Sequence, residues 1–241
     1  MKKNGFTLAE VLITLGIVGV VAAMTIPTLV ANYQKQVYGT SLAAAVSDIE
    51  NAFSLMAQEK GNGLLQDTPF MKASSTAEAA EYLEEYLQLE NSVDKPSLIY
   101  DSTNPKSVSG KSSFQNLFSD RTFITKKGFV IITYPNTDDR MWLSEAEAAE
   151  NGTTLAKGVL EIMLDINGTK KPNTMGRDFF GFLIDENGKL YPWGGKDYAK
   201  YMNVAEWTST TDTTNGCVDL NTAEGWGCTA RLIENKYKMD Y

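Results

Sequence analysis

Hydrophobic residues follow three different patterns along this chain. An almost uninterrupted apolar run extends over 6–30, and these 25 residues are enough to span a bilayer as a helix. Beyond it, apolar residues recur every three or four positions from Tyr38 to Met56, which predicts an amphipathic helix. Gly61-Asn62-Gly63 marks its end. We therefore expect one helix over 6–60, about 80 Å long at 1.5 Å per residue.

After this helix the hydrophobic period changes. Ser75 and Glu78 have the spacing of a capping box and predict a second helix over 76–90. The polar stretch 92–119, with Pro96, Pro105 and Gly110, is expected to be a long connection. Runs rich in β-branched and aromatic residues then predict strands over 121–125, 128–134, 159–166, 178–184 and 190–191.

These elements indicate an α+β fold. Asn187-Gly188 predicts a hairpin turn between the last two strands. Helices followed by four to five antiparallel strands favour a layer of helix on sheet. We expect the sheet to cover the apolar stripe of the long helix, because no other part of the chain is apolar enough to do so.

The charge balance excludes several classes of function. The chain of 241 residues has 22 basic and 30 acidic side chains, a net charge of −8, and no histidine. Because phosphate binding needs clusters of Lys and Arg, we predict no nucleic-acid partner. The missing histidine removes the commonest general base, and no nucleophile–base pair stands out, so we predict that the chain is not an enzyme.

One acid interrupts the apolar run near its start. Placing Glu10 inside hydrocarbon costs roughly 2.5–3.5 kcal/mol, so an acid there is a functional candidate. Lys2 and Lys3 precede the run, and by the positive-inside rule they place the N-terminus in the cytoplasm and the rest of the chain outside.

The start of the chain resembles a known signal. Gly5-Phe6-Thr7-Leu8-Ala9-Glu10-Val11-Leu12-Ile13 is similar to the class III signal of type IV pilins and type II secretion pseudopilins. In that family, a prepilin peptidase cuts between the Gly and the Phe and methylates the new amine. The resemblance assigns Gly5 and Phe6 to processing, and Glu10, five residues into the mature chain, to assembly.

The resemblance also implies an organisation. Residues 1–5 would be a leader, 6–30 a transmembrane and assembly helix, and 31–241 an exported pilin-like domain that includes the amphipathic half of the helix. The expected partners are the prepilin peptidase, the inner membrane, and other copies of itself or related pilins. The expected location is a single pass through the inner membrane, followed by a periplasmic or extracellular filament.

Within that helix, Pro27 removes a backbone donor, so we expect a kink there. In pilin filaments the helix between such glycine and proline positions unwinds, which points to Gly19 and Pro27. In the assembled filament, Glu10 is expected to meet the Phe6 amine of a neighbouring subunit.

Several alternatives remain open at this point. The N-terminal segment could be an ordinary signal peptide cut after Ala23, or a plain signal anchor, although neither requires an acid at Glu10. The function could be that of a pilus subunit or of a secretion pseudopilin. A third alternative is a membrane-anchored protein that binds surfaces through Trp193, Trp207 and Trp226 and does not polymerise. We expect instead that these tryptophans fill the core and brace the loop between Cys217 and Cys228.

Two cysteines, Cys217 and Cys228, lie near the C-terminus. In an exported chain this spacing predicts a disulfide that closes a short loop, and pilins often carry such a loop. The alternative is two free buried thiols. Metal binding by these cysteines is disfavoured, because no further Cys or His is available.

The segment 165–178 has the oxygen-rich composition of a calcium loop. Its candidate ligands are Asp165, Asn167, Asn173 and Asp178. It does not match an EF-hand, since its sixth position is Lys170. Some major pseudopilins bind calcium in their C-terminal region. The alternative is a strand connection in which Asn-Gly and Pro-Asn form turns. Asn151 and Asn167 also fit glycosylation sequons, a pattern short enough to arise by chance.

Overall fold

The computed structural model describes residues 7–100, 106–110, 121–135, 150, 158–202, 206, 215–217 and 223–241. It divides into two compact units, Met1–Val37 and Tyr38–Tyr241. One helix, α1 (Leu8–Lys60), begins in the first unit and ends in the second. The end of α1 is where the sequence predicts it, and Asn62 and Gly63 follow in the left-handed conformation that closes a helix.

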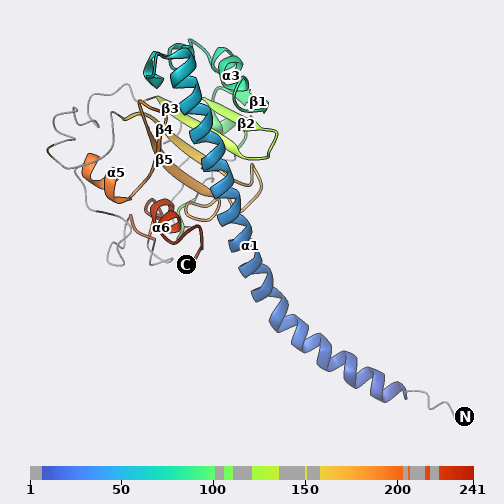
Figure 1. The fold of residues 1–241 in the computed structure, drawn as a ribbon. Coiled ribbons are helices and arrows are strands. Elements are labelled where there is room, and N and C mark those ends of the chain that lie inside the picture. Colours follow the sequence, from blue (N-terminus) through green and yellow to red (C-terminus); the bar gives the residue numbers. More distant parts are fainter. Residues whose placement is uncertain are drawn as a thin grey trace, which may run out of the picture. The chain divides into compact units, whose positions relative to one another are not determined.

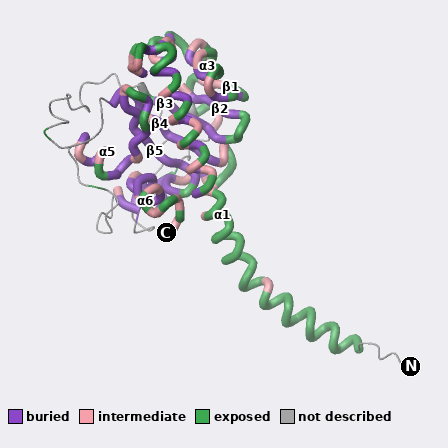
Figure 2. The backbone as a smooth tube through the Cα atoms, viewed as in Figure 1, coloured by how far each residue is buried: buried purple, intermediate pink, exposed green. Residues whose placement is uncertain are grey.

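The first unit consists of the apolar part of α1. None of its described residues is buried, and Figure 2 shows this stretch as exposed along almost its whole length. The helix runs without a break through Gly19 and Pro27. The kink and the unwinding expected at these two positions stay predictions.

Among the described residues, the second unit contains a six-stranded antiparallel sheet whose strands follow chain order. The strands are β1 (Leu89–Val93), β2 (Thr122–Thr125), β3 (Val130–Pro135), β4 (Gly158–Asp165), β5 (Phe179–Asp185) and β6 (Leu190–Pro192). The α+β fold is thus confirmed. The five predicted strands correspond to β2–β6, with bounds that differ by about two residues at most.

The second half of α1 packs across one face of this sheet (Figure 1). Its buried side chains Leu42, Ile49 and Phe53 follow the predicted stripe. They join one hydrophobic core with residues of the central strands, among them Ile131 and Phe180. The sheet therefore covers the apolar stripe of the helix, as the sequence predicts.

The opposite face of the sheet is buried as well. Met163 and Leu183 from the central strands pack there with Trp193, Tyr198 and Tyr201. Two of these aromatic residues belong to α5 (Lys196–Tyr201). Because both faces of β5 are covered, all seven of its residues are buried, which explains why its sequence shows no alternation of apolar and polar residues.

Two sequence predictions need correction. The second helix, α3 (Thr76–Glu84), ends before the predicted residue 90, and the segment Leu89–Val93 forms the edge strand β1. The sheet therefore has six strands, one more than predicted. The sequence of β1 is largely polar because it is partly exposed, so it lacks the usual signal of a strand. Parts of the predicted connection over 92–119 lie outside the described residues.

The remaining short elements complete the second unit. The N-cap of α3 is Ser75, whose hydroxyl accepts a hydrogen bond from the Glu78 amide, as predicted. The Glu78 carboxylate, however, accepts from Ser74. The other elements are η1 (Leu65–Asp67), α2 (Pro69–Lys72), η2 (Pro96–Leu98) and α6 (Cys228–Glu234).

The predicted hairpin turn between β5 and β6 is present. Gly188 has a positive φ of 85° there. A Cβ at this position would lie 2.6 Å from the carbonyl carbon of Phe53 in α1. Glycine is thus required both by the turn conformation and by the close approach of the hairpin to the helix.

Candidate functional site

Glu10 lies in the first turn of α1 and caps its own helix. Its Oε2 accepts hydrogen bonds from the amide and the hydroxyl of Thr7, each at 2.8 Å. The Thr7 hydroxyl in turn accepts from the Glu10 amide at 3.3 Å. This is a capping box, in which Thr7 is the N-cap and Glu10 satisfies a backbone donor that the helix leaves free.

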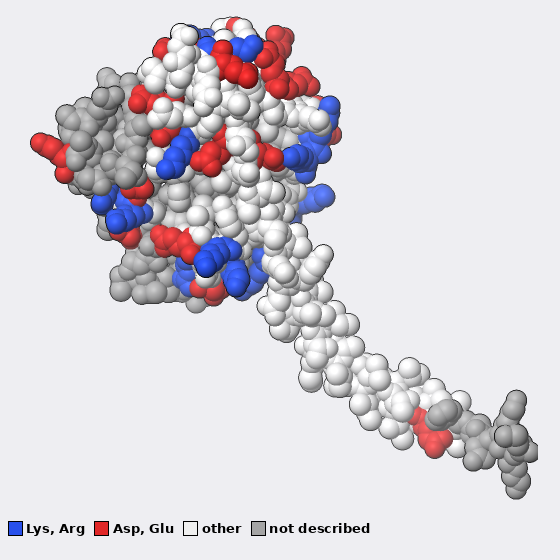
Figure 3. Space-filling model, in the orientation of Figure 1, with Lys and Arg blue, Asp and Glu red and all other residues white. Residues whose placement is uncertain are grey.

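The surface that follows Glu10 carries no charge for several turns. Glu10 is the only charged residue between Thr7 and Gln34, and Figure 3 shows the corresponding part of α1 as an uncharged rod. Large apolar side chains such as Leu12, Ile17 and Leu29 are more than half exposed on it. This helix is long and apolar enough to cross a membrane. The predicted processing residues Gly5 and Phe6 lie outside the described residues.

The second candidate site is the loop between β4 and β5. The structure brings together all four residues that the sequence singled out. The Asn167 amide donates to Asp165 Oδ1 at 3.2 Å, and the Asn167 side-chain nitrogen donates to Asp178 Oδ2 at 3.1 Å. The Asn173 amide donates to the same Asp178 oxygen at 2.8 Å. We call these four residues the carboxylate–amide cluster.

Both carboxylates of the cluster are fully buried, and neither forms an ion pair within the part of the chain that the structure describes. Burial raises the pKa of Asp165 well above its ordinary value and that of Asp178 to about 6. The Tyr100 hydroxyl donates to Asp165 Oδ2 at 2.7 Å. Nothing in the sequence indicated Tyr100, which is 65 residues away from Asp165.

Two oxygens of the cluster have no hydrogen-bond partner among the described residues. They are the buried side-chain oxygens of Asn167 and Asn173, and Asn173 is only 4 % exposed. An unsatisfied buried carbonyl oxygen is costly unless another group occupies its lone pairs. Two amide oxygens and two carboxylates are hard donors that suit Ca²⁺. The residues therefore fit calcium.

The alternative interpretation of this loop also has support. Gly168, Asn173 and Gly176 have positive φ angles, as turn formers do. In addition, the described residues contain no group of three or more His, Cys, Asp or Glu that could hold a metal. A calcium ion would therefore depend on the amide oxygens of Asn167 and Asn173, and on backbone carbonyls, as much as on the two carboxylates.

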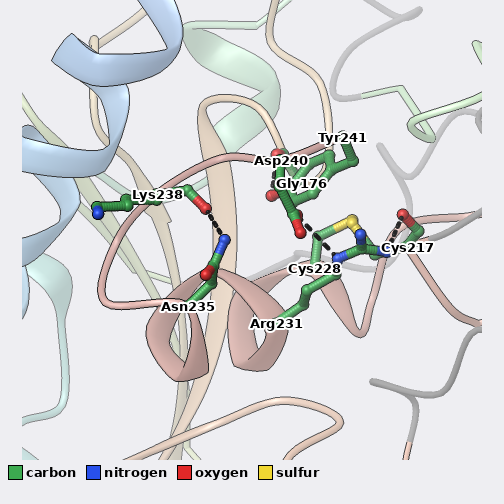
Figure 4. A network of polar contacts seen from close by, with 8 residues as sticks. All are labelled: Gly176, Cys217, Cys228, Arg231, Asn235, Lys238, Asp240 and Tyr241. Carbon is green, nitrogen blue, oxygen red and sulfur yellow. Dashed lines mark hydrogen bonds and ion pairs between the residues drawn. A yellow bond between two sulfur atoms is a disulfide. The ribbon is translucent and has the colours of Figure 1, made fainter.

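The disulfide between Cys217 and Cys228 is present, and both cysteines are buried. Arg231 connects it to the C-terminus (Figure 4): its Nη1 donates to the Cys217 carbonyl at 3.3 Å, and its Nε forms an ion pair with Asp240 at 3.0 Å. The Tyr241 hydroxyl donates to the Gly176 carbonyl at 2.7 Å, so the C-terminus also holds the loop that carries the cluster.

The other sequence candidates gain less support. Trp193 is 6 % exposed and contacts Trp226 with ring centroids 5.4 Å apart, which places it in the core. Trp207 and the sequon at Asn151 lie outside the described residues. Asn167 belongs to the carboxylate–amide cluster, and the side-chain nitrogen to which a glycan would be attached donates a hydrogen bond to Asp178.

Comparison with known proteins supports the assignment of the N-terminus. Residues 1–26 match the family model described as the prokaryotic N-terminal methylation motif. This motif is the signal of type IV pilins and pseudopilins, and the long helix packed with an antiparallel sheet is a pilin-like layout. No curated protein and no solved structure matches the chain.

Proposed function

We propose that this chain is a structural subunit, pilin or pseudopilin, of a type IV pilus-like filament. Its precursor is cut by a prepilin peptidase between Gly5 and Phe6, methylated at Phe6, and assembled through its N-terminal helix. The observation that carries the proposal is the methylation motif at residues 1–26, followed by an exposed apolar helix with one acid, Glu10.

The capping box supports a specific role for Glu10. In the single subunit, hydrogen bonds from Thr7 satisfy the carboxylate. In a filament, the methylated amine of Phe6 on a neighbouring copy supplies a cation in the same apolar environment. Because desolvation offsets much of the attraction between two buried charges, this pair fixes the register between subunits more than it adds stability.

The first test determines the N-terminus of the mature protein. The full chain is produced together with a prepilin peptidase, and its N-terminal peptide is sequenced by mass spectrometry. The expected result is a chain that begins with N-methylated Phe6. An intact Met1, or a start at Met24 after signal-peptide cleavage, would refute the proposal.

The second test is Glu10→Val in the organism that carries the chain. The variant is expected to enter the membrane and to be processed, but to reduce sheared filaments at least tenfold. Thr14→Val is the matched control, since Thr14 bonds only to carbonyls of its own helix. Normal filament numbers in Glu10→Val would contradict the role of this residue.

The same experiment separates the alternatives. A type II secretion pseudopilin would show a secretion defect in Glu10→Val together with loss of a short periplasmic filament. A membrane-anchored binding protein would form no filament in the wild type and would keep surface binding in the variant.

The carboxylate–amide cluster supports a second proposal, a structural Ca²⁺ site at Asp165, Asn167, Asn173 and Asp178. Its basis is a pair of amide oxygens beside two buried carboxylates, for which the described part of the chain provides neither hydrogen-bond donors to the amide oxygens nor counter-ions to the carboxylates. Bound calcium would supply the positive charge that these carboxylates lack and would hold the β4–β5 loop.

Calorimetry on the fragment 31–241 tests this site. We expect heat on addition of Ca²⁺ and a calcium-dependent rise in melting temperature, and both should be lost in Asp178→Asn and Asn173→Ala. Asp185→Asn is the control, because Asp185 is equally buried but accepts hydrogen bonds within its own hairpin turn. Absence of heat and of a thermal shift in the wild type would remove the site.

A further inference from the structure

The acidic and basic side chains of the second unit are unevenly distributed between the two ends of its part of α1. Residues 48–92 contain nine acidic and two basic side chains. This segment surrounds the C-terminal end of α1, where Glu59 accepts a hydrogen bond from Tyr86 and Lys60 pairs with Glu85 at 2.9 Å. We call this the acidic end of the unit.

The opposite end of the unit carries more exposed basic than acidic side chains, and its exposed acids are Glu234 and Asp240. At Tyr38 and Gly39, α1 lies against Asn167 and Tyr237. Five basic side chains of these two neighbouring segments are exposed: Lys170, Lys171, Arg177, Lys236 and Lys238. Lys60 lies 22 positions after Tyr38, so about 33 Å of helix separate the two ends. Figure 3 shows acidic side chains beside α3, and basic together with acidic side chains at the lower edge of this unit.

The acidic end contains an open groove with a volume of about 410 Å³. It lies between α1, the segment 85–88 and the turn from β2 to β3. Its apolar lining is Ala52, Leu55, Leu87 and Phe129. Leu55 is 48 % exposed, although it lies outside the apolar run of the first unit. The other three apolar lining residues are buried, so Leu55 is the exposed apolar side chain of the groove, and the charged side chains beside it determine which chain the groove fits.

The groove is bordered by two acids and by Lys127, and each acid already forms an ion pair at the surface. Asp48 pairs with Lys127 at 2.7 Å and Glu85 pairs with Lys60, and all four side chains are partly exposed. Such pairs contribute little to stability and exchange readily for other partners. Glu84 and Glu90 nearby are exposed and form no ion pair within the described residues.

We infer that this groove receives the exposed Lys170-Lys171 segment of a second copy of the chain. The inference rests on the proposed function, in which copies are staggered along a common axis. The lysine stems would cover Leu55, while their ammonium groups reach Asp48 and Glu85. Contact between two acidic or two basic ends is repulsive, so the charge pattern selects contact between opposite ends.

Cross-linking between two full-length copies tests this contact. One tagged copy carries Leu55→Cys and a second, differently tagged copy carries Lys171→Cys, expressed together in the organism that carries the chain. We expect a mixed disulfide at least fivefold more abundant than with Lys72→Cys, an exposed lysine of the acidic end. Equal yields would overturn the inference, as would cross-linking of Leu55→Cys only to a different protein.

Charge reversal provides a second measurement. Lys170→Glu with Lys171→Glu is expected to reduce sheared filaments at least tenfold, and adding Glu84→Lys with Glu85→Lys should restore them to within threefold of wild type. If the lysine reversals reduce filaments and the added Glu84→Lys and Glu85→Lys changes restore none of them, the contact is overturned. All four side chains are exposed, and an unchanged melting temperature of each variant confirms that it folds.

The outcomes separate this inference from the proposed function. If Glu10-dependent filaments form but the cross-link is absent, the groove contact fails and the filament assignment stands. If the cross-link forms while the wild type makes no filament and Glu10→Val changes nothing, the filament assignment fails and the contact stands. Absence of both overturns both.

Discussion

At the scale of single residues, Glu161 departs most from the rule that buried side chains are apolar or hydrogen-bonded. It lies in the middle of β4 and, two residues from Met163, points to the same face of the sheet. Its Oε1 is buried and has no hydrogen-bond partner within the segments that the structure describes. Burial raises the pKa of Glu161 to about 7. Burial first, and the Glu161 carboxylate second, also raise the pKa of Tyr198.

This residue should make the stability of the exported domain depend on pH. The pKa of Glu161 is higher in the folded state than its ordinary value of 4.5, so protonated Glu161 favours folding. Its contribution is complete below pH 4.5 and is lost as pH rises toward 7, with a total change of up to about 3 kcal/mol. We expect Glu161→Gln to gain stability relative to wild type between pH 5 and pH 8.

Urea unfolding of the fragment 31–241 with a calcium chelator measures this effect, because the chelator removes any contribution from metal binding. Glu90→Gln, an exposed change in β1, is the control and should parallel the wild type at every pH. If the free energy of unfolding of Glu161→Gln also parallels that of the wild type at every pH, Glu161 titrates near its ordinary pKa.

At the scale of elements, the contact between α1 and the C-terminal segment depends on the absence of a side chain. Lys236 and Tyr237 both have positive φ angles, which return the chain toward the helix after α6. A Cβ at Gly39 would lie 2.0 Å from the Tyr237 carbonyl oxygen. The backbone therefore comes closer to α1 than any side chain other than that of glycine would allow.

Gly39→Ala should accordingly destabilise the exported domain. Alanine favours a helix over glycine by up to about 1 kcal/mol, but displacing the Tyr237 backbone costs about 1–3 kcal/mol more. We expect a melting temperature of the fragment 31–241 that is several degrees lower. Ser47→Ala, an exposed change on the same helix, should leave it nearly unchanged. A higher melting temperature for Gly39→Ala would mean that the contact is loose.

The elements differ in how far their sequences predict them. β2–β6 and both ends of the amphipathic stripe were predictable, because apolar period and turn residues are local signals. β1 was not, since an exposed edge strand can be polar. The second buried face of the sheet was not predictable either. Its apolar residues, such as Tyr100 and Trp193, lie far apart in the sequence and meet only after folding.

The candidate sites follow the same rule. Glu10 was predictable, because an acid in an apolar run is anomalous by itself. The four cluster residues were identified by composition alone, and the structure added the two unpartnered oxygens and the donor Tyr100. The groove at Leu55 had no sequence signal, since it combines side chains from α1, the segment 85–88 and the turn from β2 to β3.

At the scale of the whole molecule, stability and assembly belong to different parts of the chain. Every described residue that is buried lies at or beyond Gly39, and the two hydrophobic cores begin at Leu42 and Tyr100. The apolar part of α1 before Val37 contributes no buried side chain. Hydrophobic burial is the main favourable term in folding, so we expect residues 7–30 to add almost nothing to the stability of the second unit.

The fragment 31–241 should therefore fold without the membrane segment. We expect its near-ultraviolet circular dichroism to match that of the full chain in detergent, and its free energy of unfolding to agree within about 1 kcal/mol. The full chain should need detergent, because its exposed apolar helix has no partner in water. Loss of the near-ultraviolet signal in the fragment would show that the apolar segment takes part in the fold, and the division between an assembly helix and an independent exported domain would be wrong.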